Sequence, residues 1–202
     1  MSKIIKSKTK IYRSIGVAYS SKSKSADYSM RRPGAHGSKP IRLTEYGRQL
    51  KEKKKLFASY NVSNRYLSNS VEKSKKSSGS ATNNLCSFLE RRLDIIVYRS
   101  NFARTIYSAC QLVSHSHIMV NGKVVNIKSY LVKDGDVISV RSKSRDLFTV
   151  QDAKSAKKHK TPVYIDLLED QYSVKFIRDP EVSEIPYEFD IDLRMVIKFY
   201  SR

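Results

Sequence analysis

Apolar residues recur at helical spacing along the first half of the chain. Tyr46, Leu50 and Phe57 fall on one face of a helix, and the neighbouring lysines fall mainly on its other faces. Thr44 is a favourable N-cap, and Glu45 suits the first turn, where a negative charge meets the helix dipole. The pattern therefore predicts a helix that starts after Thr44 and buries the three apolar side chains.

Three more helical patterns follow before residue 115. The first includes Tyr66–Val71 and ends at a lysine- and serine-rich stretch, residues 73–80, which is typical of a linker or loop. Thr82 then caps one longer helix with an apolar stripe at spacings of four, four and three: Leu85, Leu89, Leu93 and Ile96. Thr105 starts a shorter helix. Its expected inward-facing residues are Ala109, Leu112 and Val113.

The pattern then changes to short strands. Ile118–Val120 and residues 123–125 flank Asn121-Gly122, which supplies the positive φ angles of a type I′ hairpin turn. Further expected elements are strands at Val137–Val140 (after a turn at 134–136), Val163–Leu168 and Tyr172–Ile177, a basic helix at Leu147–Lys158 and a final helix through Ile191, Met195 and Phe199. This order predicts an α+β fold, a helix pair with an antiparallel sheet inside a more helical frame.

The charge is large and unevenly placed. Of 202 residues, 39 are Lys or Arg and 19 are Asp or Glu, which gives a net charge of +20. Residues 1–60 hold 16 basic and 3 acidic residues, and residues 61–160 hold 18 and 7, whereas residues 161–202 hold 5 and 9. Lysine can reflect genome composition or solvated helices, but such an excess repels itself unless a polyanion is bound. We expect a nucleic acid, bound by the first 160 residues.

Other classes of partner and compartment fit less well. No window approaches 18 consecutive apolar residues, and no basic segment has a strong apolar face, so we expect no membrane partner. The start of the sequence lacks the apolar stretch of a secretory signal. Cys86 and Cys110 form neither a CxxC pair nor a disulfide framework, which favours reduced thiols without structural zinc.

The signatures of catalysis and metal binding are missing or weak. The sequence has no GxxxxGK[ST], GxGxxG or HExxH motif. His115 and His117 are remote from the other histidines and from a carboxylate cluster, so a helix cap or a phosphate contact is the better interpretation. Cys110 and His115 lack a third orienting group, and the acidic residues near the end resemble a solvated or docking face. We expect no enzyme, no metal and no cofactor.

Several long motifs in fixed order resemble the S-four family of small-subunit ribosomal proteins, in its bacterial and organellar form. The resemblance is nearly end to end and is strongest at Gln111–Ile127. The motifs are Arg32–Gly37, Thr44–Lys53, Asn84–Leu85, Leu89–Arg99, Gln111–Ile127, Ser129–Tyr130, Gly135–Asp136 and Phe199–Arg202.

The resemblance implies a domain organisation. Residues 1–42 would be an extended basic arm that orders on its partner (the alternative is a disordered tail without specific contacts), and, with no zinc cysteines, this arm would fold without metal. Residues 43–88 would form a helical domain completed by residues 188–202. Residues 89–178 would be the family's RNA-binding module, and residues 179–202 an acidic linker and C-terminal helix.

The resemblance also implies a role and partners. Proteins of this family are structural constituents of the small ribosomal subunit that bind its ribosomal RNA early and nucleate assembly of the subunit body. They lie near the mRNA entry channel and contact neighbouring small-subunit proteins at an interface tied to decoding accuracy, which would explain the acidic C-terminal stretch.

The expected RNA-binding residues combine arginine forks for phosphate with polar groups at the hairpin, because an RNA junction is read through its shape, phosphates and 2′-hydroxyls. Gly122 lets the hairpin tip approach the RNA backbone closely. The full set is Arg31, Arg32, His36, Arg48, Lys51, Arg91, Arg92, Arg99, Arg104, Gln111, His115, Asn121, Gly122 and Lys123.

Two positions depart from the pattern of the family that the chain resembles. Ile106 and Cys110 stand where the family usually carries arginines on the second helix of the module. Arg104 can replace the first arginine and nothing replaces the second, so we expect contacts to shift to Arg91 and Arg92.

Two other functional classes fit the chain less well. An RNA-modifying enzyme that carries the same module would need a catalytic domain for which the chain has no room. A stand-alone RNA-binding factor of ribosome rescue or stress is the alternative, but it would lack the motifs at Arg32–Gly37 and at the C-terminus. For the compartment, the lysine, serine and isoleucine bias and the absence of a transit peptide slightly favour an organelle-encoded mitochondrial protein over bacterial cytoplasm or plastid.

Overall fold

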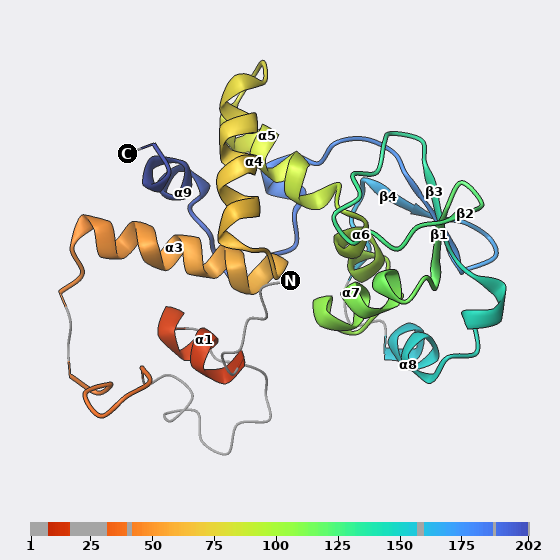
Figure 1. Ribbon diagram of the computed structural model, residues 1–202, viewed down its shortest axis with the longest axis horizontal. Helices are drawn as coiled ribbons and strands as arrows, with labels where there is room; N and C mark the ends of the chain where they lie inside the picture. Colours follow the sequence, from red (N-terminus) through yellow and green to blue (C-terminus); the bar gives the residue numbers. More distant parts are fainter. Residues whose placement is uncertain (1–7, 17–31, 40–41, 157–159, 188, 202) are drawn as a thin grey trace. The chain divides into compact units, whose positions relative to one another are not determined.

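A computed structural model describes residues 8–16, 32–39, 42–156, 160–187 and 189–201 (Figure 1). Its fold is α+β, as predicted. The helices are α1 (Lys8–Ile15), α3 (Glu45–Tyr60), α4 (Asn64–Lys76), α5 (Ala81–Glu90), α6 (Leu93–Arg99), α7 (Ile106–Ser114), α8 (Phe148–Ala156) and α9 (Leu193–Phe199). Two 3₁₀ turns, η1 (Ser142–Ser144) and η2 (Val182–Glu184), and five strands complete it: β1 (Ile118–Val120), β2 (Lys123–Val124), β3 (Val137–Val140), β4 (Ile165–Leu167) and β5 (Ser173–Phe176).

The chain divides into two compact units. The first comprises residues 1–71 and 187–202, and the second comprises residues 72–186. The boundary falls inside α4 rather than at residue 88, so residues 72–88 group with the sheet-containing unit. The 3₁₀ turn η2 belongs to the second unit and α9 to the first.

The first unit is helical, and α3 packs against both α1 and α9. The Thr44 hydroxyl accepts a hydrogen bond from the backbone N–H of Gly47 at 3.2 Å, which confirms the predicted N-cap. The buried face of α3 differs from the expected one. It carries Gln49, Leu56 and Tyr60, whereas Tyr46 is 50% exposed. The tertiary partners of α3 select a face rotated from the one that the apolar spacing suggested.

Helix α1 is an element that the expectation of an unstructured basic arm missed. Ile15 is buried, and the Tyr12 ring meets the Phe189 ring edge-on, with centroids 6.2 Å apart. Residues 1–7, 17–31 and 40–41 lie outside the described residues, so the rest of the expected arm is seen only at 32–39. The four-residue spacing of Ile11 and Ile15 gives this short basic segment an apolar side that packs on α3.

In the second unit, the long helix expected from Thr82 onward is two helices. Arg92, between α5 and α6, has extended dihedrals (φ −68, ψ 136) and forms an isolated antiparallel bridge with Leu131. The N–H of Val132 donates to the Arg91 carbonyl, and the N–H of Leu93 donates to the Tyr130 carbonyl, both at 2.9 Å. Backbone partners from a distant loop therefore replace the helical hydrogen bonds at this point.

The helical ends around residue 80 also differ from the sequence interpretation. Lys73, Lys75 and Lys76 belong to the last turns of α4 rather than to a linker. The Asn84 side-chain amide donates to the Ser78 carbonyl at 3.0 Å and to two further carbonyls near the end of α4. The cap position of α5 is Ser80, without a side-chain hydrogen bond, and Thr82 lies inside that helix.

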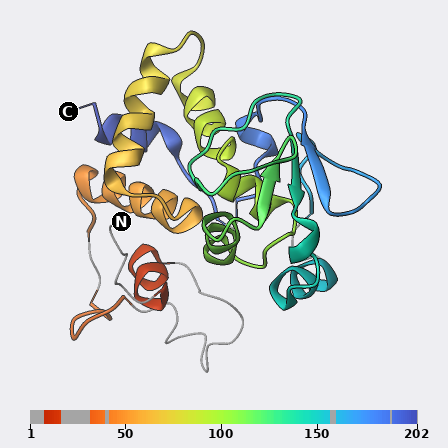
Figure 2. The ribbon, with the colours of Figure 1, turned by 45° about the vertical axis from the view of Figure 1, so that its right-hand side comes forward.

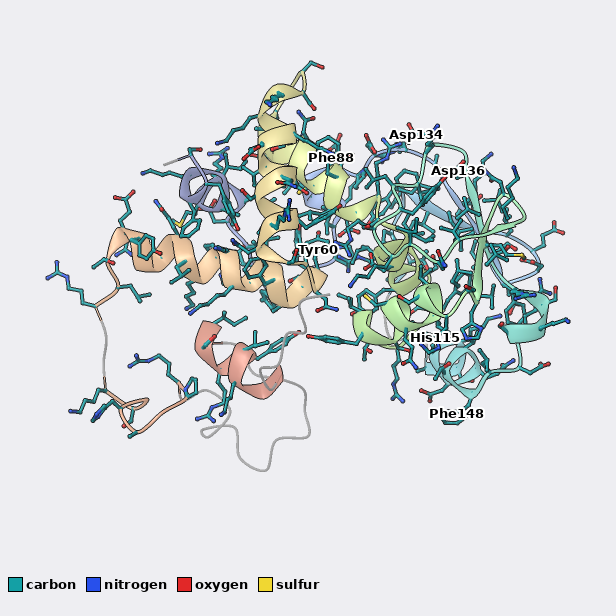
Figure 3. All side chains as sticks on the ribbon, viewed as in Figure 1. Tyr60, Phe88, His115, Asp134, Asp136 and Phe148 are labelled. Atoms are coloured by element: carbon teal, nitrogen blue, oxygen red, sulfur yellow. The ribbon has the colours of Figure 1, made fainter. Side chains whose placement is uncertain are left out.

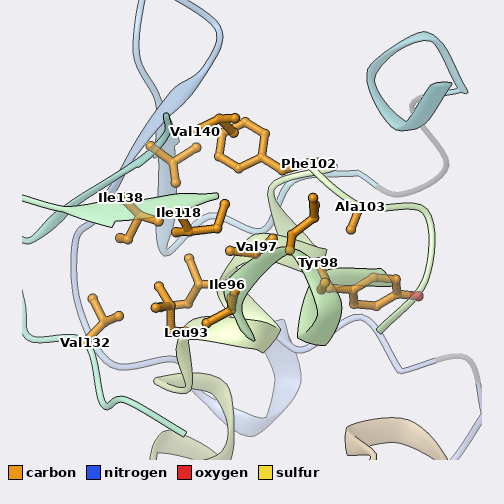
Figure 4. Close-up of a cluster of buried hydrophobic side chains, with 14 of the residues drawn as sticks. Leu93, Ile96, Val97, Tyr98, Phe102, Ala103, Ile118, Val132, Ile138 and Val140 are labelled. Carbon is orange, nitrogen blue, oxygen red and sulfur yellow. The ribbon is translucent and has the colours of Figure 1, made fainter. Parts of the chain in front are cut away.

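The sheet has the order β2-β1-β3-β5-β4, and all neighbouring strands are antiparallel. The predicted hairpin is confirmed, since Asn121 (φ 49) and Gly122 (φ 76) have the left-handed conformations of a type I′ turn. Helices α6 and α7 lie beside the sheet (Figure 2), and the inward residues of β1 and β3 pack with them in one core (Figure 4). Its labelled members in Figure 4 include Leu93, Ile96, Val97, Phe102, Ile118, Ile138 and Val140.

Candidate nucleic-acid interface

Helix α7 presents one polar side to solvent. The Thr105 hydroxyl accepts from the backbone N–H of Ser108 at 3.2 Å, which fixes the start of the helix as predicted. The residues predicted to face inward, Ala109, Leu112 and Val113, are all buried. Gln111 and His115, from the expected RNA-binding set, are exposed, and Figure 3 shows His115 at the C-terminal end of α7. The helical periodicity that buries these three residues in the core therefore places Gln111 and His115 on the solvent side.

At the hairpin tip, Asn121, Gly122 and Lys123 are all exposed, but they have different roles. The Asn121 amide donates to Asp136 Oδ1 at 2.8 Å, and its carbonyl oxygen accepts from the N–H of Val137 at 2.9 Å. Asn121 thus attaches the turn to the start of β3. Nothing lies within 4 Å of the position a Gly122 Cβ would take, so this glycine is required by its left-handed φ alone.

The C-terminal end of α7 is joined to η1. His117 Nδ1 lies 2.9 Å from Ser144 Oγ, and the Arg141 N–H donates to the His117 carbonyl at 2.9 Å. The His115 and His117 rings have centroids 6.2 Å apart. The exposed end of α7 and the segment after β3 therefore form one continuous surface.

Arg91 is half-buried and braces the second unit. Its Nε donates to the Val132 carbonyl at 2.8 Å, Nη1 lies 3.1 Å from Asp179 and Nη2 lies 3.4 Å from Asp134. The guanidinium carbon lies 5.8 Å from the Phe176 ring centroid. Most of its hydrogen-bonding capacity is used inside the chain, which weakens the case for Arg91 as an RNA contact.

Arg92 and Arg99 are buried, contrary to their expected place on an exposed face. Arg92 donates to both oxygens of Asp94, at 3.0 and 2.6 Å, and Arg99 donates to both oxygens of Glu90, at 3.2 and 2.9 Å. Neither acid is accessible to solvent. Each arginine neutralises a buried carboxylate, so the structure assigns both of them to the interior of the chain rather than to a nucleic-acid surface.

The two departures from the family pattern face inward as well. Cys110 Sγ lies 3.2 Å from Asp94 Oδ2, so the thiol meets the same carboxylate as Arg92. Ile106 is partly buried against the core. Arg104 remains exposed, with 58% of its side chain accessible, and its Nη1 lies 3.0 Å from Asp152 Oδ2.

The remaining expected residues lie in the first unit or outside the description. His36 and Arg48 are exposed, whereas Arg32 and Lys51 are half-buried. The Arg32 guanidinium donates to the Lys39 carbonyl, which closes the 32–39 turn. Arg31 lies outside the described residues.

Some exposed cations beside α7 were absent from the expected set. Arg141 and Lys143 both lie on the segment that joins β3 to α8, adjacent to His117. Their position directly after a predicted strand was the available signal, because residues at the end of a strand emerge at the edge of the sheet.

The charges near the C-terminus are largely paired. Arg178 donates to Glu184, and this hydrogen bond lowers the pKa of the Glu184 carboxyl. The Asp192 carboxylate accepts from the N–H groups of Arg194 and Met195, at 3.0 and 3.2 Å, and so caps α9. Glu181, Asp190 and Asp192, among the acidic residues near the end of the chain, are exposed.

Two features are absent from the part of the chain that the structure describes. No helix among the described residues is long and apolar enough to cross a membrane. Within the same residues, no three His, Cys, Asp or Glu side chains gather in a way that could hold a metal ion.

The helix pair, the hairpin and β3 together define an RNA-binding module of the kind called the S4 domain. The S4 domain family matches residues 91–138, which include α6, α7, β1, β2 and the start of β3. The family described as Ribosomal protein S4/S9 N-terminal domain matches residues 3–90.

Full-length relatives carry the identification further. The chain is 40% identical over 208 residues to the small ribosomal subunit protein uS4 of Pelagibacter ubique and 38% identical over 205 residues to that of Paramagnetospirillum magneticum, each over the whole of both chains. It is 43% identical over 171 residues to uS4 of Thermotoga petrophila, covering 84% of this chain and 81% of the relative. The chain belongs to the uS4 family of small ribosomal subunit proteins.

Proposed function

We propose that this chain is a structural constituent of the small ribosomal subunit that binds small-subunit ribosomal RNA. The observation that carries the proposal is the exposed polar surface of the S4 domain, formed by α7 and the β1–β2 hairpin in a chain of net charge +20. The chain acts as a scaffold for RNA and not as a catalyst, in keeping with a structural family.

The RNA surface proposed for the second unit is smaller than the sequence suggested. Exposed side chains can reach phosphates and 2′-hydroxyls, whereas buried ion pairs cannot. In the second unit these are Arg104, Gln111, His115 and Lys123, with the open backbone at Gly122. From the first unit the proposal keeps Arg31, Arg32, His36, Arg48 and Lys51.

The finer parts of the role rest on the family resemblance. They are nucleation of the subunit body, contact with mRNA near the entry channel, a contribution to decoding accuracy and contact with neighbouring small-subunit proteins. Exposed acidic residues near the end of the otherwise basic chain, such as Glu181 and Asp190, support the last of these, because acidic side chains suit a basic protein neighbour. No observation favours a stand-alone rescue or stress factor.

The compartment is a separate proposal. The sequence bias suggests an organelle-encoded mitochondrial protein, whereas the relatives compared above come from bacteria. Sequencing the ribosomal RNA that co-purifies with the endogenous protein decides between them, because mitochondrial, plastid and bacterial small-subunit RNAs differ in sequence.

Binding of the full chain to a transcript of its small-subunit ribosomal RNA tests the proposed surface. Lys123→Ala should weaken binding and reduce the magnitude of the log–log salt slope by roughly 0.7 to 0.9, because one phosphate contact is lost. Lys175→Ala is the matched control, since Lys175 is an exposed lysine on β5 of the same unit. Equal slopes for Lys123→Ala and the wild type would remove the hairpin from the interface, and a wild-type slope near zero would refute the electrostatic account.

A further inference from the structure

The segment between β3 and α8, residues 141–147, is a compact series of turns stabilised by backbone hydrogen bonds and by buried side chains. The N–H of Ser144 donates to the Arg141 carbonyl at 2.8 Å, and the N–H of Arg145 donates to the Ser142 carbonyl at 3.2 Å. Ser144, in the middle of the segment, and Val150, in the first turn of α8, are buried, which anchors the segment to the unit. Side chains that point outward from it are therefore presented on a fixed backbone.

Phe148, the first residue of α8, points into solvent with 81% of its surface exposed. An aromatic ring in this position is costly to hydrate, and the fold uses almost none of its area. Figure 3 shows the ring at the outer edge of α8, pointing away from the sheet.

The charges around Phe148 favour an anionic partner. Arg141 and Lys143 are exposed on the preceding turns, with one exposed carboxylate, Asp146, among them. Arg145 lies 3.4 Å from Asp170 and its guanidinium lies 4.8 Å from the Tyr172 ring centroid, so its charge is already partnered. Two exposed cations on the turns that lead to an unpacked ring form a combination that suits single-stranded nucleic acid, with phosphates on the cations and a base on the ring.

This segment continues the surface of α7. Arg141 and Ser144 are both hydrogen-bonded to His117, so the segment lies against the turn that follows His115. An RNA strand that passes along the polar side of α7 would next meet Arg141, Lys143 and Phe148.

We propose that Phe148 stacks on an unpaired base of the bound RNA while Arg141 and Lys143 contact its phosphates. This extends the RNA-binding surface beyond residues 91–138, the part matched by the S4 domain family, and it rests on the proposed function. The partner class is single-stranded ribosomal RNA, because unstacked loop bases are the ones available to an exposed aromatic side chain.

The test uses the full chain and the small-subunit ribosomal RNA transcript. Phe148→Ala and Phe148→Leu should each weaken binding by roughly 5- to 100-fold, the range expected for one lost base–aromatic stack, with the salt slope unchanged. Phe148→Tyr should bind like the wild type, because it keeps the ring face. Val163→Ala is the matched control, since Val163 is 73% exposed in the same unit.

A spectroscopic readout separates stacking from a general loss of affinity. The chain has no tryptophan, so Phe148→Trp introduces a single reporter whose fluorescence should be quenched when RNA saturates the protein. If the wild type binds and Phe148→Ala binds equally well, or the tryptophan signal does not change, the stacking inference is overturned and the proposed function stands. If the wild type itself fails to bind the transcript, both are overturned. Concentration-dependent self-association that Phe148→Ala abolishes would instead assign the ring to a contact between copies.

Discussion

Arginine residues that look alike in the sequence have different surroundings in the structure. Arg99 neutralises inaccessible Glu90, which also accepts a hydrogen bond from the Tyr164 hydroxyl at 2.8 Å, whereas Arg104 extends into solvent. The charge pattern predicts a polyanion partner but cannot distinguish the two arginines, because the distinction depends on which face of a helix a sheet covers. The only signal in the sequence that an arginine is buried was an acidic residue close to it along the chain, such as Asp94 near Arg92.

The buried Arg99–Glu90 pair should contribute more to stability than an exposed pair. Arg99→Ala should lower the free energy of unfolding by about 3–5 kcal/mol, because the buried Glu90 carboxylate loses the positive charge that neutralises it. Arg104→Ala, which removes an exposed pair, should change it by at most about 1 kcal/mol. Urea unfolding of the full chain, followed by circular dichroism, measures both.

A double variant tests whether the uncompensated charge causes the loss of stability. Combining Arg99→Met with Glu90→Gln removes both charges, so the double variant should be less destabilised than the sum of the two single variants. Equal stability of Arg99→Ala and Arg104→Ala would contradict the assignment of Arg99 to the interior.

At the scale of elements, local patterns predicted most of the second unit. The caps at Thr44 and Thr105 and the Asn121-Gly122 turn act within a few residues, so the sequence contains the information for them. The break between α5 and α6 depends on residues 130–132, about forty positions away, and no helical periodicity reveals it. For the same reason the buried face of α3 could not be assigned before its partner α9 was known.

Within the first unit, an aromatic cluster at the C-terminal end of α9 joins this helix to its neighbours. The centroid of the Phe199 ring lies 5.6 Å from that of the Tyr46 ring and 5.2 Å from that of the Tyr200 ring. Lys53 Nζ lies 4.4 Å from the Phe199 ring centroid. The Tyr200 hydroxyl donates to Asn64 Oδ1 at 2.7 Å. Phe199 and Tyr200, from the family-like end of the chain, therefore have a structural use, since they join α9 to α3 and α4.

Tyr200 gives this attachment a pH dependence. Burial raises the pKa of Tyr200 from 10.0 to about 12. The folded state thus favours the neutral phenol, so its contribution to stability is complete below pH 10 and is lost as the pH rises toward 12. Tyr200→Phe should be about 1 kcal/mol less stable than the wild type at pH 8, through the lost hydrogen bond.

Thermal unfolding from pH 8 to pH 11.5 measures the effect. The difference in stability between the wild type and Tyr200→Phe should narrow above pH 10, because only the wild type loses the contribution of the neutral phenol. Tyr46→Phe, at a half-exposed tyrosine of the same unit, controls for the general effect of removing a tyrosine hydroxyl. A gap for Tyr200→Phe that widens with pH would refute the buried neutral phenol.

At the scale of the whole molecule, composition and resemblance predicted the class of protein, and the relatives confirm it. The net charge of +20 belongs to a chain whose buried arginines are already neutralised, so the exposed lysines and arginines carry the excess. Which of them contact RNA depends on the path of a partner that no sequence pattern specifies.

The most direct test of the central claim is sedimentation of the endogenous protein through sucrose gradients at moderate and high salt, with sequencing of the RNA in its fractions. An integral small-subunit protein should co-migrate with small subunits and remain there at high salt, with small-subunit ribosomal RNA as the bound RNA. A protein that peaks away from the subunits, or leaves them at moderate salt, would contradict a structural role in the ribosome.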